Sequence, residues 1–300
     1  MRDQIDHDMN NDLGQTVIHV LDSLCPNEAE LGTTNEAINP NPYQHADETN
    51  NDNTGMKDQD KYWGEITGEE LDPNVVKKAR KLELDYFKSK KVYHKVPRAK
   101  ARAITGKNPI TIRWIDVNKG DDKNPNYRSR LVAREMNYGK EESIFAATPP
   151  LEAKKALFSI VASRHGRNGK AMKISFVDIS RAYFNAKCEQ PTFIELPTED
   201  SEEGMIGELD MCMYGTRRAA QGWEAEYIST MTKIGFECGK ASPCCFYHRK
   251  WDLRCVVHGD DFACIGEEED LNRYELALEN HYELKIRGSL GPEDTDLKEI

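Results

Sequence analysis

The sequence contains no long hydrophobic run and no apolar leader segment. No stretch reaches the roughly 18 consecutive apolar residues of a transmembrane helix, so the sequence predicts no membrane span. The first residues, MRDQIDHDMNNDLGQ, are acidic and polar, whereas a secretory signal requires an apolar core. We therefore expect an intracellular protein, cytoplasmic with possible access to the nucleus, that is not secreted and has no membrane partner.

Cysteine pairs with metal-binding spacing are also absent. None of the eight cysteines forms a CxxC pair, and the neighbouring His248, His258 and Cys264 match no metal signature. Buried free thiols in a reducing compartment are the interpretation that the sequence favours. The cysteines are Cys25, Cys188, Cys212, Cys238, Cys244, Cys245, Cys255 and Cys264.

Positive charge is scarce at both ends of the chain and abundant in the middle. Residues 1–72 carry 3 Lys and Arg against 17 Asp and Glu, a net of -14, and residues 171–300 carry 14 against 26, a net of -12. Residues 73–170 carry 24 against 9, a net of +15. The whole-chain charge of -11 argues against nucleic-acid binding, but a localised basic field attracts phosphates. The middle third is therefore a candidate nucleic-acid surface, although residues 77–102 alone fit a solvated helix equally well.

The pattern of apolar residues divides the chain into a tail and a folded region. Residues 1–60 are polar and show apolar periodicity only at 17–24, so we expect a mostly disordered acidic tail with at most one short helix. Periodicity then predicts helices at 74–90, 151–164, 217–235 and 267–281, a strand at 173–179, and hairpins at 110–118/127–135 and 253–257/262–265. This order favours an α+β fold with an antiparallel sheet.

Three aspartates lie at the ends of hydrophobic strands. Asp178 follows an apolar strand, while Asp260 and Asp261 belong to a four-residue turn, 258–261, between two apolar strands. If these strands are neighbours, the carboxylates meet at one sheet edge and repel one another unless a cation neutralises them. Mg²⁺ prefers oxygen ligands, and two such ions promote in-line phosphoryl transfer. An Asp-Asp pair alone is usually only turn chemistry, so the metal site is predicted from the combination with the upstream basic hairpin.

Five segments in the same order resemble motifs of copia-type reverse transcriptases. They are IRWIDVNKGDDKNPNYRSRLVARE, which resembles the fingers hairpin; SFVDISRAYFNAKCEQPTFIELP, similar to the Asp-Val-x-x-Ala-Phe-Leu-Asn-Gly motif; MYGTRRAAQGW, similar to Leu-Tyr-Gly-Leu-Lys-Gln-Ala-x-x-x-Trp; VVHGDDFACIG, where the family has Tyr-Val-Asp-Asp; and HYELKIRGSLG, which resembles Phe-x-Met-Lys-x-Leu-Gly. The resemblance runs from about residue 75 to about residue 295.

The resemblance implies a right-hand polymerase with fingers and a palm, whose antiparallel sheet is flanked by helices. Residues 75–300 would form this reverse transcriptase domain, with 75–170 mainly fingers and 171–300 mainly palm. The implied activity is RNA-directed DNA polymerisation, in which dNTPs are added to a primer 3′-hydroxyl on an RNA or DNA template. Two Mg²⁺ ions, or Mn²⁺, would be bound by Asp178 and Asp260, with Asp261 as a third, peripheral catalytic carboxylate.

The resemblance also assigns residues to the nucleotide. Tyr183 takes the position of an aromatic gate against the 2′-hydroxyl, and a core aromatic is the alternative interpretation. Arg128 and Arg130 share one face of a strand, so either one would hold the triphosphate by charge-assisted hydrogen bonds. The triplet QGW at 221–223 resembles a wider reverse-transcriptase motif, which would put Gln221 near the nucleotide.

Other residues would contact the template and primer, or depart from the family pattern. Arg217 and Arg218 would contact template phosphates, and Lys285 takes the position of a general acid for pyrophosphate, with a solvated lysine as the alternative. His258 and Gly259 replace the usual Tyr-Val, and His258 could still stack on or hydrogen-bond to a base at the primer terminus. Ser180-Arg181 also departs from the copia pattern and adds a cation near the acids.

Two function classes remain open at this point. The first is an active reverse transcriptase, and the second is a catalytically inactive or domesticated retroelement-derived protein that binds nucleic acid. Retention of all three acids favours the enzyme, while a metal-dependent nuclease or nucleotide cyclase would not explain the QGW triplet or the basic hairpin. Copia-type polyproteins also carry protease, integrase and RNase H regions, none of which is recognisable here. We therefore expect a piece of a longer polyprotein, with integrase and RNase H regions as partners.

Overall fold

The computed structural model describes residues 61–121, 123–136, 146–293 and 296. The predicted acidic tail, 1–60, and its short helix at 17–24 lie outside this range. Within it, helices and antiparallel strands alternate irregularly along the chain, which confirms the predicted α+β class. No helix in the described part of the chain is both long and apolar enough to cross a membrane.

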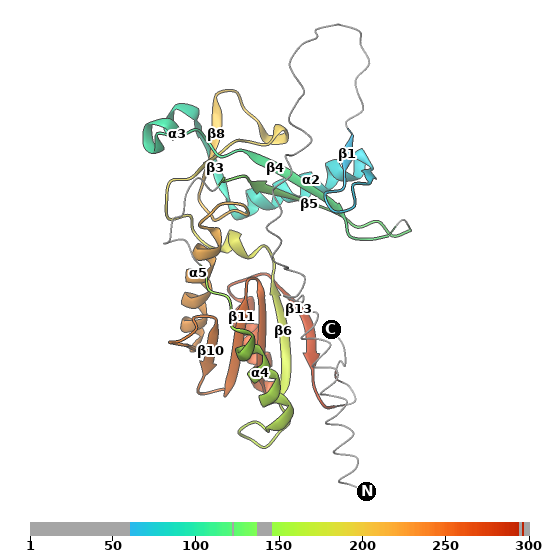
Figure 1. Ribbon diagram of the computed structural model, residues 1–300, viewed down its shortest axis with the longest axis vertical. Coiled ribbons are helices and arrows are strands. Elements are labelled where there is room, and N and C mark those ends of the chain that lie inside the picture. The colour runs from blue at the N-terminus through green and yellow to red at the C-terminus, as the bar shows by residue number, and fades with distance from the viewer. Residues whose placement is uncertain (1–60, 122, 137–145, 294–295, 297–300) are drawn as a thin grey trace, which may run out of the picture.

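Six antiparallel strands form the largest sheet among the described residues (Figure 1). In spatial order they are β13 (Leu284–Leu290), β6 (Lys173–Ile179), β12 (Asp261–Gly266), β11 (Leu253–His258), β10 (Cys245–His248) and β9 (Glu237–Cys238). The sequence predicted β6, β11 and β12 closely. It did not predict β13, β10 or β9.

Helices pack on both faces of this sheet. Trp223 and Tyr227 of α5 (Ala219–Ile234) and Tyr274 of α6 (Glu268–Glu279) share a core with Val177 and Phe262. On the other face, α4 (Leu151–Ser163) shares a core with Phe176 of β6. Because successive strand residues point to opposite faces, the even-numbered positions of β6, Asp178 included, lie on the face that α4 covers.

Residues 62–133, together with 182–213, form a second packed region at the other end of the molecule (Figure 1). It contains a three-stranded sheet, in the order β3-β8-β7, and the β4–β5 hairpin. Its elements are β1 (Tyr62–Trp63), β2 (Glu70–Leu71), α2 (Pro73–Lys90), β3 (Tyr93–Pro97), α3 (Arg98–Thr105), β4 (Ile112–Asn118), β5 (Tyr127–Ala133), η2 (Ala182–Asn185), β7 (Phe193–Ile194), η3 (Thr198–Asp200) and β8 (Met205–Leu209).

The long helix α2 begins at a well-defined cap. The carboxylate of Asp72 accepts hydrogen bonds from the backbone N–H groups of Asn74, at 2.8 Å, and Val75, at 3.4 Å, and Pro73 occupies the first helical position. These contacts satisfy donors that otherwise have no partner within the helix. The cap therefore fixes the residue at which α2 starts.

Asp72→Ala is expected to lower the free energy of unfolding by about 1 kcal/mol, because it removes both cap hydrogen bonds. Asp72→Asn keeps an acceptor oxygen and should lower the free energy of unfolding by only about a few tenths of a kcal/mol. Urea unfolding of the two variants beside the wild type measures the difference. Equal stability of the alanine and asparagine variants would contradict a role for the cap.

The seven cysteines in the described residues are free thiols, as the sequence predicted. Four of them, Cys212, Cys244, Cys255 and Cys264, are buried. Burial raises the pKa of the Cys212 thiol to about 12. These side chains therefore act as small apolar groups of the core at neutral pH.

Candidate active site

The three acids meet at one end of the six-stranded sheet. β12 pairs with β6 so that Asp261 lies directly opposite Asp178, and β13 places Lys285 opposite Asp178 on the other side. Directly opposed residues point to the same face of a sheet. Asp178, Asp261 and Lys285 therefore share one face, the face that α4 covers further along the strands.

Asp260 lies in the turn that joins β11 to β12. His258 pairs with Asp261, so the connection has only two residues, Gly259 and Asp260. The sequence predicted a four-residue turn at 258–261, which is wrong because each strand continues one residue further. Gly259 has φ of +65°, and glycine at the first position of a two-residue hairpin loop provides the positive φ that suits the twist of the strands. The glycine that departs from the family pattern thus fits this turn.

Two hydrogen bonds fix the turn from opposite sides. The indole N–H of Trp223 donates to the carbonyl oxygen of Gly259 at 2.8 Å, and the backbone N–H of Ile179 donates to the carbonyl oxygen of Asp260 at 2.9 Å. Trp223 is buried under Tyr227 and Tyr282. The carboxylate turn therefore rests on the α5 core rather than moving as a free loop.

Gly259→Ala is expected to destabilise the fold by about 1 kcal/mol, since a side chain at positive φ is strained even in open space. No heavy atom lies within 4 Å of the position that a Cβ would take, so no collision adds to this cost. Denaturant unfolding measures the change. A loss of several kcal/mol, or a gain in stability, would contradict the backbone geometry described here.

Arg287 contacts two of the acids. Its Nη2 lies 2.8 Å from Asp178 Oδ2 and 3.2 Å from Asp261 Oδ1. The register of β13 against β6 shifts between Ile286 and Gly288, so Arg287 is the extra residue of a β-bulge. A bulge re-aims the side chains near it. Arg287 is thereby directed at the carboxylates, a contact that the sequence pattern did not indicate.

The carboxylates at this sheet edge repel one another, so a positive charge beside them lowers the cost of their ionisation. Burial raises the pKa of the Asp261 carboxyl, Arg287 opposes the rise, and the charges of Asp260 and Asp178 add to it. Crowded carboxylates of this kind suit a hard divalent cation such as Mg²⁺, so the donor type fits. Across the described ranges, no three His, Cys, Asp or Glu side chains have the spacing of a metal site. Arg287 supplies the positive charge beside Asp178 and Asp261.

His258 lies at the rim of the site together with a lysine that the sequence did not single out. The Nζ of Lys154, on α4, is 3.4 Å from His258 Nδ1. Burial lowers the pKa of His258, and the nearby lysine lowers it further. The imidazole is therefore neutral at pH 7 and accepts from Lys154. A lysine near the start of a helix has no distinctive sequence signal, because only the sheet pairing reveals what it faces.

The predicted nucleotide residues Tyr183 and Arg130 converge on Tyr214. The ring centroids of Tyr183 and Tyr214 are 4.7 Å apart, and the guanidinium carbon of Arg130 lies 5.1 Å from the Tyr214 ring centroid. Burial raises the pKa of Tyr214 to about 12, and the charge of Asp260 contributes to this rise and to that of Tyr183. The structure thus brings Tyr183 and Arg130 together around Tyr214.

Arg128 lies beside this group on β5. Burial lowers the pKa of Arg128, and repulsion from Arg130 and Arg181 lowers it further. No described carboxylate lies within ion-pair distance of Arg128 or Arg130. Two guanidinium groups without acidic partners form a site suited to a multiply charged anion.

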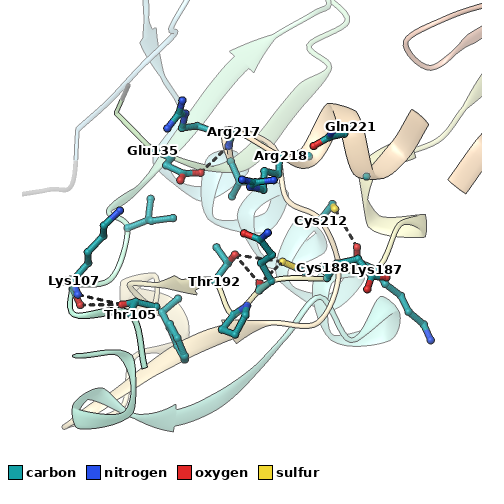
Figure 2. A pocket seen from close by; sticks show the side chains of 18 of the residues that line it. Thr105, Lys107, Glu135, Lys187, Cys188, Thr192, Cys212, Arg217, Arg218 and Gln221 are labelled. Atoms are coloured by element: carbon teal, nitrogen blue, oxygen red, sulfur yellow. Dashed lines mark hydrogen bonds between the residues drawn. The ribbon is translucent and has the colours of Figure 1, made fainter. Parts of the chain in front are cut away.

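Gln221, Arg217 and Arg218 lie elsewhere, in a cavity of about 600 Å³ at the start of α5 (Figure 2). Residues 105–110 beyond α3 and 187–193 before β7 form its other walls. The backbone N–H of Arg217 donates to Glu135 Oε2 at 2.7 Å. None of the three acids lines this cavity. The structure therefore groups Gln221 with Arg217 and Arg218 along one cavity.

Comparison with known proteins gives the family. The family described as reverse transcriptase (RNA-dependent DNA polymerase) matches residues 91–292, which include the three acids and the two arginines of β5. The chain is also 22% identical over 209 residues to the "Retrovirus-related Pol polyprotein from transposon TNT 1-94" of Nicotiana tabacum. This alignment covers 66% of the chain and 15% of that polyprotein. The chain therefore belongs to the reverse transcriptase family and corresponds to the reverse transcriptase region of a copia-type retrotransposon Pol polyprotein.

Proposed function

We propose that this chain is an RNA-directed DNA polymerase, which extends a primer 3′-hydroxyl with dNTPs on an RNA or DNA template. The observation that carries the proposal is the placement of Asp178 opposite Asp261, with Asp260 in the adjoining two-residue turn. These acids and the half-buried arginine pair of β5 belong to a chain of the reverse transcriptase family. Acids and cations so placed suit a nucleoside triphosphate better than any neutral substrate.

In this proposal the six-stranded sheet and its helices act as the palm, and the β4–β5 hairpin with α2 acts as the fingers. The hairpin carries Arg128 and Arg130, and α2 packs beneath it through Leu84 and Phe87 in a common core with Leu131. A rigid platform of this kind orients the reacting groups. The cysteine-rich interior of the sheet excludes water from the side away from the acids.

Asp178 and Asp260 would hold the two Mg²⁺ or Mn²⁺ ions, with Asp261 supporting them. The bound ions would acidify the primer 3′-hydroxyl and neutralise charge on the leaving pyrophosphate. Asp178 is held at its strand position by β12 on one side and β13 on the other. Trp223 and Ile179 hold the backbone of the turn that carries Asp260.

Arg128 and Arg130 would bind the triphosphate, and the Tyr183 ring would lie under the sugar, where it leaves no room for a 2′-hydroxyl. Burial against Tyr214 limits the freedom of the Tyr183 ring, which supports such a steric role. His258 at the rim would meet the primer terminus. Gln221 would lie at the nucleotide, while Arg217 and Arg218, which line the same cavity, would contact the template.

A primer-extension assay tests the proposal. The wild type is expected to extend a DNA primer on an RNA template in the presence of Mg²⁺, and Asp260→Asn is expected to abolish the product. The variant is a matched control because asparagine keeps the size and the turn preference of aspartate. Absence of any Mg²⁺-dependent product that Asp260→Asn removes would overturn the enzyme assignment.

A catalytically inactive, retroelement-derived nucleic-acid-binding protein is the second candidate. The ion pairs of Arg287 with Asp178 and Asp261 favour it, because they balance the carboxylates without a metal. Under this alternative the wild type would bind a primer–template duplex yet give no product with either metal. Association with integrase and RNase H regions of a longer polyprotein is proposed for both candidates, on the basis of the Pol relative.

A further inference from the structure

One nitrogen of Arg287 contacts two of the three acids at once. Its Nη2 lies 2.8 Å from Asp178 Oδ2 and 3.2 Å from Asp261 Oδ1. A Mg²⁺ ion shared by these carboxylates would lie about 2.1 Å from the same oxygens. The guanidinium and the ion therefore compete for one position, because two cations held so close to the same oxygens repel each other.

The backbone of β13 directs Arg287 to this position. Arg287 is the extra residue of the bulge, and the next residue, Gly288, has φ of +127°, a conformation that favours glycine. In the motif Phe-x-Met-Lys-x-Leu-Gly, which residues 282–288 resemble, Arg287 stands at the position of the leucine. A leucine carries no charge, so the internal cation is a feature of this chain.

The contact of Arg287 with the acids is one that a divalent ion can displace. The side chains of Arg287 and Asp261 are 47% and 41% exposed. Ion pairs at such exposed positions contribute little to stability, because water solvates the separated groups almost as well. A divalent ion carries twice the charge of a guanidinium and binds closer to the carboxylates. The strand pairing of β13 with β6 is formed by the backbone, so it persists when the Arg287 side chain moves away.

We propose that Arg287 is an internal cation that occupies the divalent-cation site of the free chain and must leave Asp178 and Asp261 before a metal ion binds there. The residue thereby sets the Mg²⁺ concentration at which the site fills. This inference rests on the proposed function, since it takes Asp178 as a metal ligand, and deepens it by naming a residue that regulates the same site. It involves no nucleic acid, so metal binding by the free chain tests it.

Titration of the whole chain with Mn²⁺ in about 0.15 M salt, followed by electron paramagnetic resonance of the free ion, measures the binding. The ions counted are those whose binding is lost on Asp178→Asn, made in the wild type and in each variant. Arg287→Met is expected to bind these ions about 10-fold more tightly than the wild type, because the ion no longer has to displace two weak ion pairs. R287Q, which is polar but uncharged, should shift the affinity in the same direction.

Lys285→Met is the matched control, because Lys285 has the same charge, lies on the same strand and pairs directly opposite Asp178. It forms no ion pair among the described residues, so its removal changes only the surrounding field, which salt screens. The Mn²⁺ affinity should then change by less than about 3-fold. An Arg287→Met affinity no higher than that of the wild type, or an equal gain in Lys285→Met, would overturn the inference.

Primer extension is measured separately. A wild type that makes no product, but whose Asp178-dependent Mn²⁺ affinity rises in Arg287→Met, would refute the proposed function and leave the inference intact. Mg²⁺-dependent extension by a wild type that binds Mn²⁺ as tightly as Arg287→Met would refute the inference alone. Absence of Asp178-dependent Mn²⁺ binding in both proteins would overturn the inference together with the metal site on which it rests.

Discussion

Asp178→Asn is expected to slow primer extension by about 10³-fold, the upper end of the loss seen when one group that stabilises the transition state is removed. The asparagine side chain has the size of aspartate but lacks the negative charge that would bind a divalent cation. It still accepts a hydrogen bond from Arg287, so the strand pairing of β6 with β12 and β13 should persist. Single-turnover extension of a labelled primer measures the rate.

Asp252→Asn is the matched control for this prediction. Asp252 lies in the turn between β10 and β11, at the opposite end of the sheet, and accepts from Tyr247 and Arg254. Its φ of +52° is one that asparagine tolerates. Wild-type activity is therefore expected for Asp252→Asn. Similar activities for the two variants, at matched melting temperatures, would show that Asp178 takes no part in the reaction.

Trp223→Ala is expected to lower the free energy of unfolding by about 3–5 kcal/mol, the usual cost of deleting a buried large aromatic side chain. Trp223 is 2% exposed and packs edge-on against Tyr227, Phe262 and Tyr282. Its loss opens the core directly beneath the carboxylate turn. Guanidinium unfolding with an unchanged m-value would verify that the effect is on stability alone.

Trp223→Phe separates the packing from the hydrogen bond. The ring remains, but the carbonyl oxygen of Gly259 loses its donor, which should cost about 1–2 kcal/mol and slow primer extension by displacing Asp260. Tyr227→Phe is the matched control on the same helix, because among the described residues its hydroxyl contacts only the Cys244 sulfur, at 3.9 Å. If the two variants lose activity equally, then the indole bond has no specific role in positioning the turn.

Local sequence pattern predicted the central strands well, because their burial imposes continuous apolar runs. The predicted strand at 173–179 and helix at 151–164 match β6 and α4 to within a residue. The described cysteines are free thiols as predicted, but only four of the seven are buried. These elements depend on neighbours that are close in the sequence or on a face buried along its whole length.

Long-range pairing could not be predicted in this way. β3 pairs with β8 across more than a hundred residues, and within its short sequence, YHKVP, the half-buried charged side chain of Lys95 hides any alternation. β13 escaped detection because the bulge at Arg287 breaks its period of two. The sequence pattern therefore did not reveal β13, nor Arg287, the cation in it that contacts Asp178 and Asp261.

The QGW triplet shows that two residues of one short motif can face different parts of the molecule. Residues two apart on an α-helix point about 200° apart around its axis. Trp223 accordingly reaches the Gly259 carbonyl in the acid turn, while Gln221 lines the cavity with Arg217. The predicted role of Gln221 at the nucleotide stays a prediction.

The most direct test of the account is the number of divalent cations that the acids hold. A complex of the wild type with an RNA template, a dideoxy-terminated DNA primer and the matching dNTP would be titrated with Mn²⁺ and followed by electron paramagnetic resonance. We expect two tightly bound Mn²⁺ ions per chain beyond those that the dNTP and duplex bind without protein, and loss of at least one in Asp178→Asn. An unchanged number and affinity of bound ions in that variant would contradict it.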